Sequence, residues 1–400
     1  MTEPDAKNIA EAVNRLKIFV GALVKSGVKS GDDWRAWRQI EANEVFMAEC
    51  FEYCREAGMP AVTNLVRPFF HPSLPLIGLN YTPVAHNTLH QFASGWTPVM
   101  RLCRGIVLTR RSRLVAFPFP KFFNYGEHAE ASVLPDNVAF SATLKHDGHL
   151  GILFEYGGQL IATTRGSFLS SSGAIANEML AANPELLARW RKSRLVHKDV
   201  TLLCEIIHPE TKVIVDYGDR REFILIGAFN RVTFEDYDYE HLQKFARALG
   251  IAVTERLTGK SLADLAAMVK ETKYLNLEGI VVRFDNGLRV KLKYAGYVGK
   301  MIEDKVDYRY MMLRCLDGSH QKRFGDLPAE LQMLAQKIVD ELMAVRQVQG
   351  DKKARWNYLY NLVPEEERTP YHKGICRKFY AWLVEQDEKQ AAQETSASAA

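Results

Sequence analysis

Apolar residues recur at helical spacing at both ends of the chain, and strand-like patterns lie between them. From Asp5 to Lys25 the apolar positions are three or four residues apart, which predicts an amphipathic helix. These positions are Ile9, Val13, Leu16, Val20 and Leu23. A second helical region is predicted over residues 32–57, ahead of Gly58. Residues 300–390 are again helical in pattern.

Short apolar runs fill the middle of the chain. The clearest form a hairpin in which Gly157 and Gly158 supply the positive φ angles of a two-residue turn. A second hairpin turns at residues 285–287. Strands are predicted at residues 104–108, 114–119, 149–156, 159–165, 200–207, 212–217, 222–229, 279–284 and 288–294. Two helices interrupt them, at residues 236–249 and 261–271.

These patterns predict an α+β protein in four parts. A helical N-terminal extension covers residues 1–60, and an antiparallel β-rich domain covers residues 61–299. An all-helical C-terminal domain covers residues 300–390. Residues 391–400 are small and polar, a composition typical of a disordered tail.

The composition is that of an ordinary globular protein, with 47% hydrophobic and 25% charged residues among 400. No run of about 18 apolar residues occurs, and the first residues lack the pattern of a signal peptide. We therefore expect a cytoplasmic protein without membrane contact. The six scattered cysteines argue against a disulfide framework. The net charge of +4 permits a polyanionic partner without requiring one.

The tetrad Lys145-His146-Asp147-Gly148 is the most informative stretch of the chain. Lys145 ends a predicted strand, and a lysine in such a place can meet a ligand. A neutral amine can attack phosphorus and hold a nucleotide covalently, and burial with nearby cations favours the neutral form. The alternative is a solvated lysine at a turn, which is the ordinary place for this residue.

Two glutamates lie beside apolar strand residues. Glu205 is inside the apolar run 202–207, and Glu278 stands at the start of the predicted strand 279–284. A carboxylate in such surroundings is costly unless it is paired or binds a metal. Carboxylate and phosphate oxygens are the ligands that magnesium prefers. The alternative is a carboxylate at a sheet edge that points to water.

Further cations precede and follow the tetrad. Lys291 and Lys293 are two residues apart on one strand, so they share a face and repel unless an anion lies between them. A triphosphate would relieve that repulsion, although a charged outer face of an amphipathic strand is the alternative. Lys121 precedes Phe122 and Phe123, which could stack a base or belong to the core.

Taken in order, these residues resemble the covalent nucleotidyltransferase superfamily of ATP-dependent ligases and mRNA capping enzymes. Within it they are most similar to the RNA ligase family typified by the tRNA-repairing ligase of T-even bacteriophage. The resemblance runs from about Gly78 to Tyr297. Its motifs are Cys103-Arg104-Gly105-Ile106, Lys121-Phe122-Phe123-Asn124, Lys145-His146-Asp147-Gly148, Arg165-Gly166-Ser167, Glu205, Leu277-Glu278-Gly279 and Lys291-Leu292-Lys293.

The resemblance implies catalytic roles for five residues. Lys145 would take AMP from ATP as a lysyl phosphoramidate. Lys291 and Lys293 would bind the α-phosphate and help to expel pyrophosphate. Glu205 and Glu278 would bind a divalent metal, Mg²⁺ or Mn²⁺, and Glu205 would also hold the nucleotide.

The resemblance also implies a set of ATP contacts. Arg104 would hold the ribose and the neighbouring phosphate, and Lys121 would contact the leaving pyrophosphate. Phe123 would lie near the nucleotide, while Ile226 and Val281 would face the adenine. The full set is Arg104, Lys121, Phe123, Gly148, Arg165, Ile226 and Val281.

The family implies a substrate as well, namely RNA with 5′-phosphate and 3′-hydroxyl ends. The predicted helical domain stands where the phage enzyme has a tRNA-specificity domain, which suggests broken tRNA, end-healing partner enzymes and a monomer. Two positions depart from the family pattern: His149 replaces a small residue, and Arg165 replaces a lysine. DNA ligation, GTP-dependent capping and non-catalytic RNA binding are the alternatives, and a β-barrel in place of the helical domain would favour DNA ligation.

Overall fold

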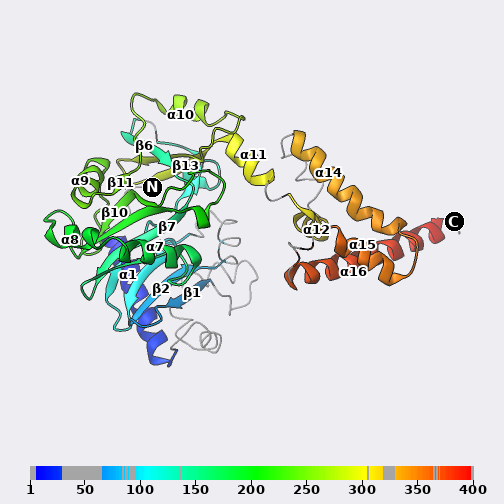
Figure 1. Cartoon of the computed structure of the whole chain (residues 1–400), viewed down its shortest axis with the longest axis horizontal. Helices are drawn as coiled ribbons and strands as arrows, with labels where there is room; N and C mark the ends of the chain where they lie inside the picture. The colour runs from blue at the N-terminus through cyan, green and yellow to red at the C-terminus, as the bar shows by residue number, and fades with distance from the viewer. Residues whose placement is uncertain are drawn as a thin grey trace. The chain divides into compact units, whose positions relative to one another are not determined.

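The computed structural model forms two compact units, Met1–Lys270 with Asn276–Tyr294, and Glu271–Leu275 with Ala295–Ala400. The residues that it describes are 6–28, 65–82, 85, 89, 96–135, 137–303, 306–318, 329–363, 365, 368 and 370–397. The expected helical region at 32–57 lies outside these residues. Each unit is described by itself, and its elements can be followed in Figure 1.

The first sheet of the first unit is a four-stranded antiparallel meander. Its strands in order are β1 (Val66–Phe70), β2 (Leu76–Tyr81), β3 (Arg104–Thr109) and β4 (Leu114–Ala116). Helix α1 (Ala6–Lys25) and the short helix α5 (Pro98–Leu102) pack against each other. The predicted apolar face of α1 is confirmed, because Leu16, Val20 and Leu23 are fully buried in the same core as this sheet.

A second sheet of five strands and a third sheet of four carry the functional motifs. The second sheet has the order β11 (Ala252–Val253), β10 (Glu222–Asn230), β9 (Val200–Ile207), β7 (His149–Tyr156) and β8 (Gln159–Thr163). The third has the order β5 (Phe123–Asn124), β13 (Arg289–Lys293), β12 (Gly279–Phe284) and β6 (Phe140–Lys145). All pairs in these two sheets are antiparallel except β10 with β11 and β13 with β5.

Three helices cover one face of the second sheet. They are α7 (Ser171–Ala181), α8 (Pro184–Lys192) and α9 (Tyr239–Leu249), and Figure 1 shows them around its strands. Their apolar residues form one core with Leu202, Cys204 and Ile206 of β9. Because side chains alternate along a strand, Leu203 and Glu205 lie on the opposite face. The sequence of β9 therefore places its one carboxylate away from the helices.

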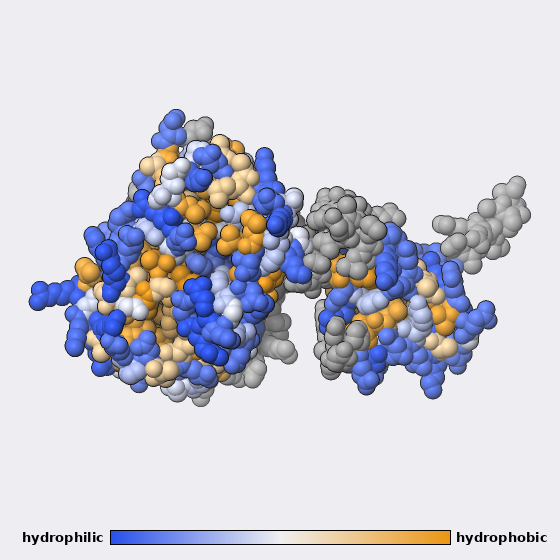
Figure 2. Space-filling view, turned by 45° about the horizontal axis from the view of Figure 1, so that its top comes forward, coloured by the Kyte–Doolittle hydropathy of each residue, from blue (hydrophilic) through white to orange (hydrophobic). Residues whose placement is uncertain are grey.

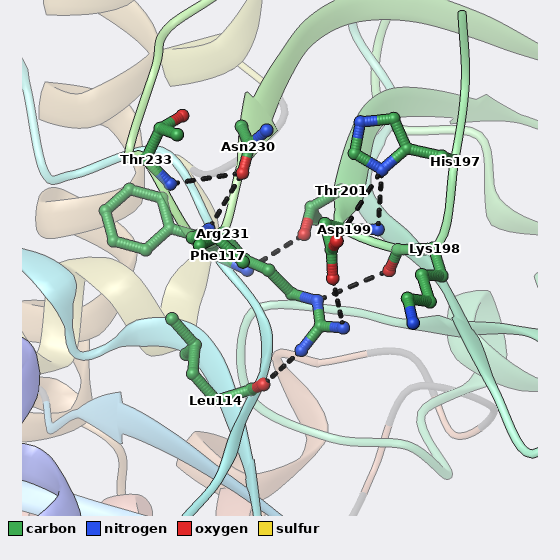
Figure 3. A network of polar contacts seen from close by, with 10 residues as sticks. Leu114, Phe117, His197, Lys198, Asp199, Thr201, Asn230, Arg231 and Thr233 are labelled. Carbon is green, nitrogen blue, oxygen red and sulfur yellow. Dashed lines mark hydrogen bonds and ion pairs between the residues drawn. The ribbon is translucent and has the colours of Figure 1, made fainter. Parts of the chain in front are cut away.

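The remaining short elements of this unit are α6 (Ala129–Ser132), the 3₁₀ turn η1 (Pro209–Thr211) and α10 (Leu262–Met268). Ser261 and Asp264 form the predicted capping box of α10. Arg231 links two sheets, as Figure 3 shows. Its guanidinium donates to the Leu114 carbonyl and to Asp199 at 2.5 and 2.7 Å.

In the second unit, every regular element within the described residues is helical. These elements are α11 (Ala295–Glu303), α12 (Tyr308–Leu316), α14 (Ala329–Met343), η2 (Ala344–Gln347), α15 (Lys352–Asn361) and α16 (Pro370–Ala397). A core of its own contains Met312, Leu342 and Phe379. None of the described helices is long and apolar enough to cross a membrane. Figure 2 shows that hydrophilic residues form much of the visible surface of both units.

The α+β class with a helical C-terminal region is confirmed, but several elements differ from the sequence prediction. The predicted strand 212–217 is wrong, because these residues form irregular backbone. The predicted strand 114–119 ends at Ala116. Strands β1 and β2 and helices α7 and α8 were not predicted. Helix α16 continues through residues 391–397, for which the composition suggested disorder.

Candidate active site

Three strands of the third sheet bring two lysines and a glutamate together. Lys145 ends β6, Lys293 ends β13, and both are register partners of Gly279, the first residue of β12. Glu278 precedes that glycine. Its Oε2 lies 2.6 Å from Lys145 Nζ, and its Oε1 lies 3.0 Å from Lys293 Nζ. A Cβ at position 279 would overlap the Leu292 carbonyl, so glycine permits the strands to approach.

Glu205 comes to the same place from the second sheet. Its side chain is buried, and its Oε1 accepts a hydrogen bond from the Gly148 N–H at 3.0 Å. Burial raises the pKa of Glu205 to about 7, with the nearby Glu278 carboxylate acting in the same direction and Lys145 opposing it. A Cβ at position 148 would overlap the Ile206 carbonyl. The tetrad glycine is therefore needed for the tetrad to lie this close to β9.

Asp147 was not among the predicted site residues, and the structure gives it a clear task. Its buried carboxylate accepts hydrogen bonds from the N–H groups of Ile214 and Val215, both at 2.8 Å. The Asp147 N–H donates a hydrogen bond to the Tyr217 hydroxyl oxygen, with an N–O distance of 2.9 Å. Asp147 thus fixes the irregular segment 212–217 beside Gly148. Asp147, Gly148 and residues of this segment line a pocket of about 290 Å³.

Two arginines meet around Tyr81. Arg165 donates to the Tyr81 hydroxyl at 3.0 Å and lies over its ring, and Arg104 also hydrogen-bonds Tyr81. Desolvation lowers the pKa of Arg104, and the positive charge of Arg165 acts in the same direction. Arg104 Nη1 is buried and has no hydrogen-bond partner among the described residues. A donor of this kind, next to a second guanidinium, suits an anion.

Lys291 and Lys121 extend this group of cations along the sheet. Lys291 Nζ donates to the Phe122 carbonyl at 3.2 Å and lies 4.5 Å from the centre of its ring. Burial and then the charges of Arg104, Lys121 and Lys145 bring the pKa of Lys291 well below its usual range. Burial lowers the pKa of Lys121 to about 8, and Glu127, 3.9 Å away, opposes this.

Phe122 and Phe123, the two aromatic residues that follow Lys121, differ in burial and in contacts. Phe123 is fully buried and stacks on His128 with ring centres 4.2 Å apart. Phe122 is only partly buried, and its ring lies under both Lys291 and Arg104. Phe122 thus presents a partly exposed ring to two cations, and the Phe123 ring centre lies 4.7 Å from Lys121 Nζ, so the place of Phe123 near the nucleotide stays a prediction.

The two residues expected to face adenine lie on opposing sheets. Val281 is partly buried in β12, opposite Lys291 and Thr143 in register. Ile226 is partly buried in β10, at the irregularity between Leu225 and Gly227. One apolar side chain from each sheet could enclose a flat ring between them. The contacts of Ile226 and Val281 with adenine stay predictions.

The two carboxylates fit a divalent cation that is also bound by phosphate. Within the described residues no three His, Cys, Asp or Glu side chains form a complete metal site. Glu205 and Glu278 are both buried, and repulsion from the Glu278 carboxylate adds to the effect of burial in raising the pKa of Glu205. A cation between them would offset that repulsion, and phosphate oxygens would complete its ligands.

Comparisons with known proteins agree on one family. The family model described as RNA ligase matches residues 102–305. A protein of Thermovibrio ammonificans named as a candidate RNA ligase is 29% identical over 208 residues, covering 50% of this chain and 53% of its own length. The chain thus spans about half the length of the curated relative it matches.

Solved structures of ligases are more distantly similar. Naegleria gruberi RNA ligase with ATP and Mn has 16% identity and a TM-score of 0.32, covering 41% of this chain and 51% of its own. A candidate ATP-dependent DNA ligase from Aquifex aeolicus has 12% identity and a TM-score of 0.38, covering 87% and 80%.

Proposed function

Because the chain belongs to the RNA ligase family, we propose that it is an ATP-dependent RNA ligase that joins 3′-hydroxyl and 5′-phosphate ends. The observation that carries the proposal is the position of Lys145 Nζ. It lies 2.6 Å from Glu278, and Lys145 shares one face of the third sheet with Lys291 and Lys293. An amine beside a proton acceptor and a row of cations is suited to attack a phosphate.

In the first step the Lys145 amine attacks the α-phosphorus of ATP, and the bond to pyrophosphate breaks. The amine must lose a proton, and Glu278 Oε2 is the nearest acceptor in the structure. Lys291 and Lys293 would offset the charge that develops on the α-phosphate oxygens. Arg104, Lys121 and Arg165 would hold the pyrophosphate as it leaves. A divalent metal on Glu205 and Glu278 would supply Lewis-acid stabilisation of the phosphate oxygens.

In the second step a 5′-phosphate oxygen of RNA attacks the AMP phosphorus. The phosphorus–nitrogen bond breaks, and Lys145 recovers its proton. In the third step the 3′-hydroxyl of an RNA end attacks the 5′-phosphate and AMP leaves. Covalent capture divides one difficult joining reaction into easier transfers.

The helical second unit favours RNA over DNA as the substrate, because every regular element described after Tyr294 is a helix and the alternative required a β-barrel. We propose RNA repair in the cytoplasm as the setting, with broken tRNA as the RNA, end-healing enzymes as partners, and a monomer as the active form. We assign nucleotidyl transfer to residues 61–299 and RNA selection to residues 300–390.

Incubation with α-labelled ATP and Mg²⁺ tests the first step. We expect an acid-labile label on the protein that depends on Lys145, and its absence would favour a non-catalytic RNA-binding protein. A panel of substrates then tests the rest: nicked anticodon loops, linear single strands and nicked duplexes, in RNA and in DNA. GTP in place of ATP distinguishes a capping-type reaction.

A further inference from the structure

A second pocket of about 610 Å³ adjoins the cations of the candidate site. Helix α5, the segment 119–122, the turn 233–236 after β10, and the hairpin between β12 and β13 line it. Five of its twenty lining residues are aromatic. The rings that line it are Trp96, Phe119, Phe122, Phe229 and Phe234.

The pocket and the candidate site share the face of one strand. Arg289, Lys291 and Lys293 alternate with buried residues along β13, so their side chains lie on one face. Lys293 is at the Glu278 end of this face, and Arg289 lines the pocket at the other end. Four residues of strand separate the two ends by about 13 Å. Lys121 and Phe122 line the pocket on the side nearer to Lys291.

The charges that line the pocket balance, because four basic and four acidic side chains take part, and several of them are paired. Arg101 binds Glu130 at 2.6 Å, and Asp236 accepts from both Arg283 and Arg289 at 3.0 and 2.6 Å. Lys121 has a carboxylate 3.9 Å away. A lining with balanced charges gives little net attraction for a phosphate, whereas its five aromatic rings favour a flat, neutral ring. The pocket therefore suits a nucleobase better than a phosphate.

The chemistry of the two transfer steps indicates which base could enter. Attacking and leaving groups in phosphoryl transfer lie roughly in line. Pyrophosphate must leave opposite Lys145, and the RNA 5′-phosphate that later displaces Lys145 must approach from that same side. The RNA end thus comes to the side where Lys121 would hold pyrophosphate, and Lys121 lines the pocket.

We propose that this pocket receives the base of the RNA nucleotide that carries the 5′-phosphate. The inference rests on the proposed ligase function and adds a subsite for the substrate to it. The pocket is then a positioning device for the second step. It has no part in the first step, in which RNA is absent.

Thr233 offers a way to fill the pocket from its exposed edge. It lines the pocket, is exposed and lies outside the proposed catalytic residues. Thr233→Trp adds bulk there, and Thr233→Val is its matched control, because it removes the same hydroxyl without adding bulk. Phe234→Ala is a second variant that removes a wall. Thermal unfolding of each variant shows whether it is folded.

The assay measures AMP transfer from pre-adenylylated protein to a 5′-phosphorylated RNA with a blocked 3′ end. One RNA has a base on its first nucleotide, and a matched RNA is abasic there. We expect wild-type protein and Thr233→Val to prefer the base-bearing RNA by about ten-fold or more, as base stacking on aromatic rings predicts. Thr233→Trp and Phe234→Ala should reduce this preference while self-adenylylation with ATP is unchanged.

Three results would overturn the inference. Equal rates with both RNAs in the wild-type protein would mean that the pocket takes no base at this step. A raised KM for ATP in self-adenylylation of Thr233→Trp would assign the pocket to ATP. If self-adenylylation occurs but no RNA accepts AMP, the ligase function fails and this subsite with it.

Discussion

Glu278→Gln tests the central arrangement of the site, because one buried carboxylate faces two ammonium groups. The substitution keeps the shape of the side chain and removes its charge. Lys145 and Lys293 then lose the counter-charge that lies 2.6 and 3.0 Å away. We expect a moderate loss of stability and a much larger loss of adenylylation.

The loss of stability follows from burial. Removing one partner of a buried ion pair costs about 3–5 kcal/mol. The lysine side chains are 21% and 24% exposed, so water can replace part of the lost interaction. We therefore expect a decrease of about 2 kcal/mol in the free energy of unfolding, below the fully buried range. For a unit of this size that lowers the Tm by about 4–8 °C.

The loss of activity follows from the transition state. Glu278 would accept the proton from Lys145 and would hold a metal beside the reacting phosphate. Removal of one well-placed electrostatic group typically slows a reaction by about 10²–10³-fold. The rate of label transfer from α-labelled ATP to the protein, measured below the Tm, reports this step directly.

Asp199→Asn is the matched control. Asp199 pairs with Arg231 at 2.7 Å, and the two side chains are 26% and 22% exposed, close to the values at Glu278's lysines. This pair belongs to the network of Figure 3, and neither residue is among the proposed catalytic residues. Because Asp199 is 26% exposed and Glu278 only 4%, we expect a smaller decrease in Tm and unchanged labelling. Wild-type labelling in Glu278→Gln, or an equal loss of labelling in both variants, would refute the assigned role.

Three further changes probe the site. Lys145→Ala should abolish labelling and leave the protein folded, because Glu278 keeps its ion pair with Lys293. Residual lysine-linked AMP would contradict the assignment of Lys145 as the nucleophile. Gly148→Ala should cost about 1–3 kcal/mol in urea unfolding, because the new methyl overlaps the Ile206 carbonyl; an unchanged midpoint would contradict this. Glu205 has a folded pKa raised to about 7 from 4.5, so ionising it disfavours folding, and its contribution to stability is lost as pH rises between those values. That loss is on the order of 3 kcal/mol, and Glu205→Gln should flatten the curve of unfolding free energy against pH.

Local sequence signals were enough for several strands and for the family. The hairpin at Gly157-Gly158 forms as predicted, because its turn residues are adjacent in sequence and its strands follow at once. The ordered motifs predicted the RNA ligase family, and the family match to residues 102–305 confirms that family. The hairpin turn and the ordered motifs can both be read along the sequence without knowing which distant segments come into contact.

The arrangement of the site depends on distant segments, which the sequence does not specify locally. Lys145 and Glu278 are 133 residues apart and meet through the register of β6 with β12. The predicted strand at 212–217 failed for a related reason. Its run of three consecutive apolar residues is typical of a strand, but the Asp147 carboxylate binds the N–H groups of Ile214 and Val215 in place of a neighbouring strand. The periodicity of a segment cannot predict that a distant side chain will bind its backbone N–H groups.

The balance of buried charge explains why these residues suit a polyanion. Repulsion among neighbouring cations contributes to the lowered pKa of Arg104, Lys121 and Lys291. A triphosphate among them would reverse that repulsion, and each of these cations would then be stabilised in its charged form. Attachment of AMP to Lys145 makes its nitrogen neutral, so Glu278 Oε2 loses an ammonium partner and becomes available to a metal. The same carboxylate can therefore accept the Lys145 proton in the first step and give the cation a further oxygen ligand in the later steps.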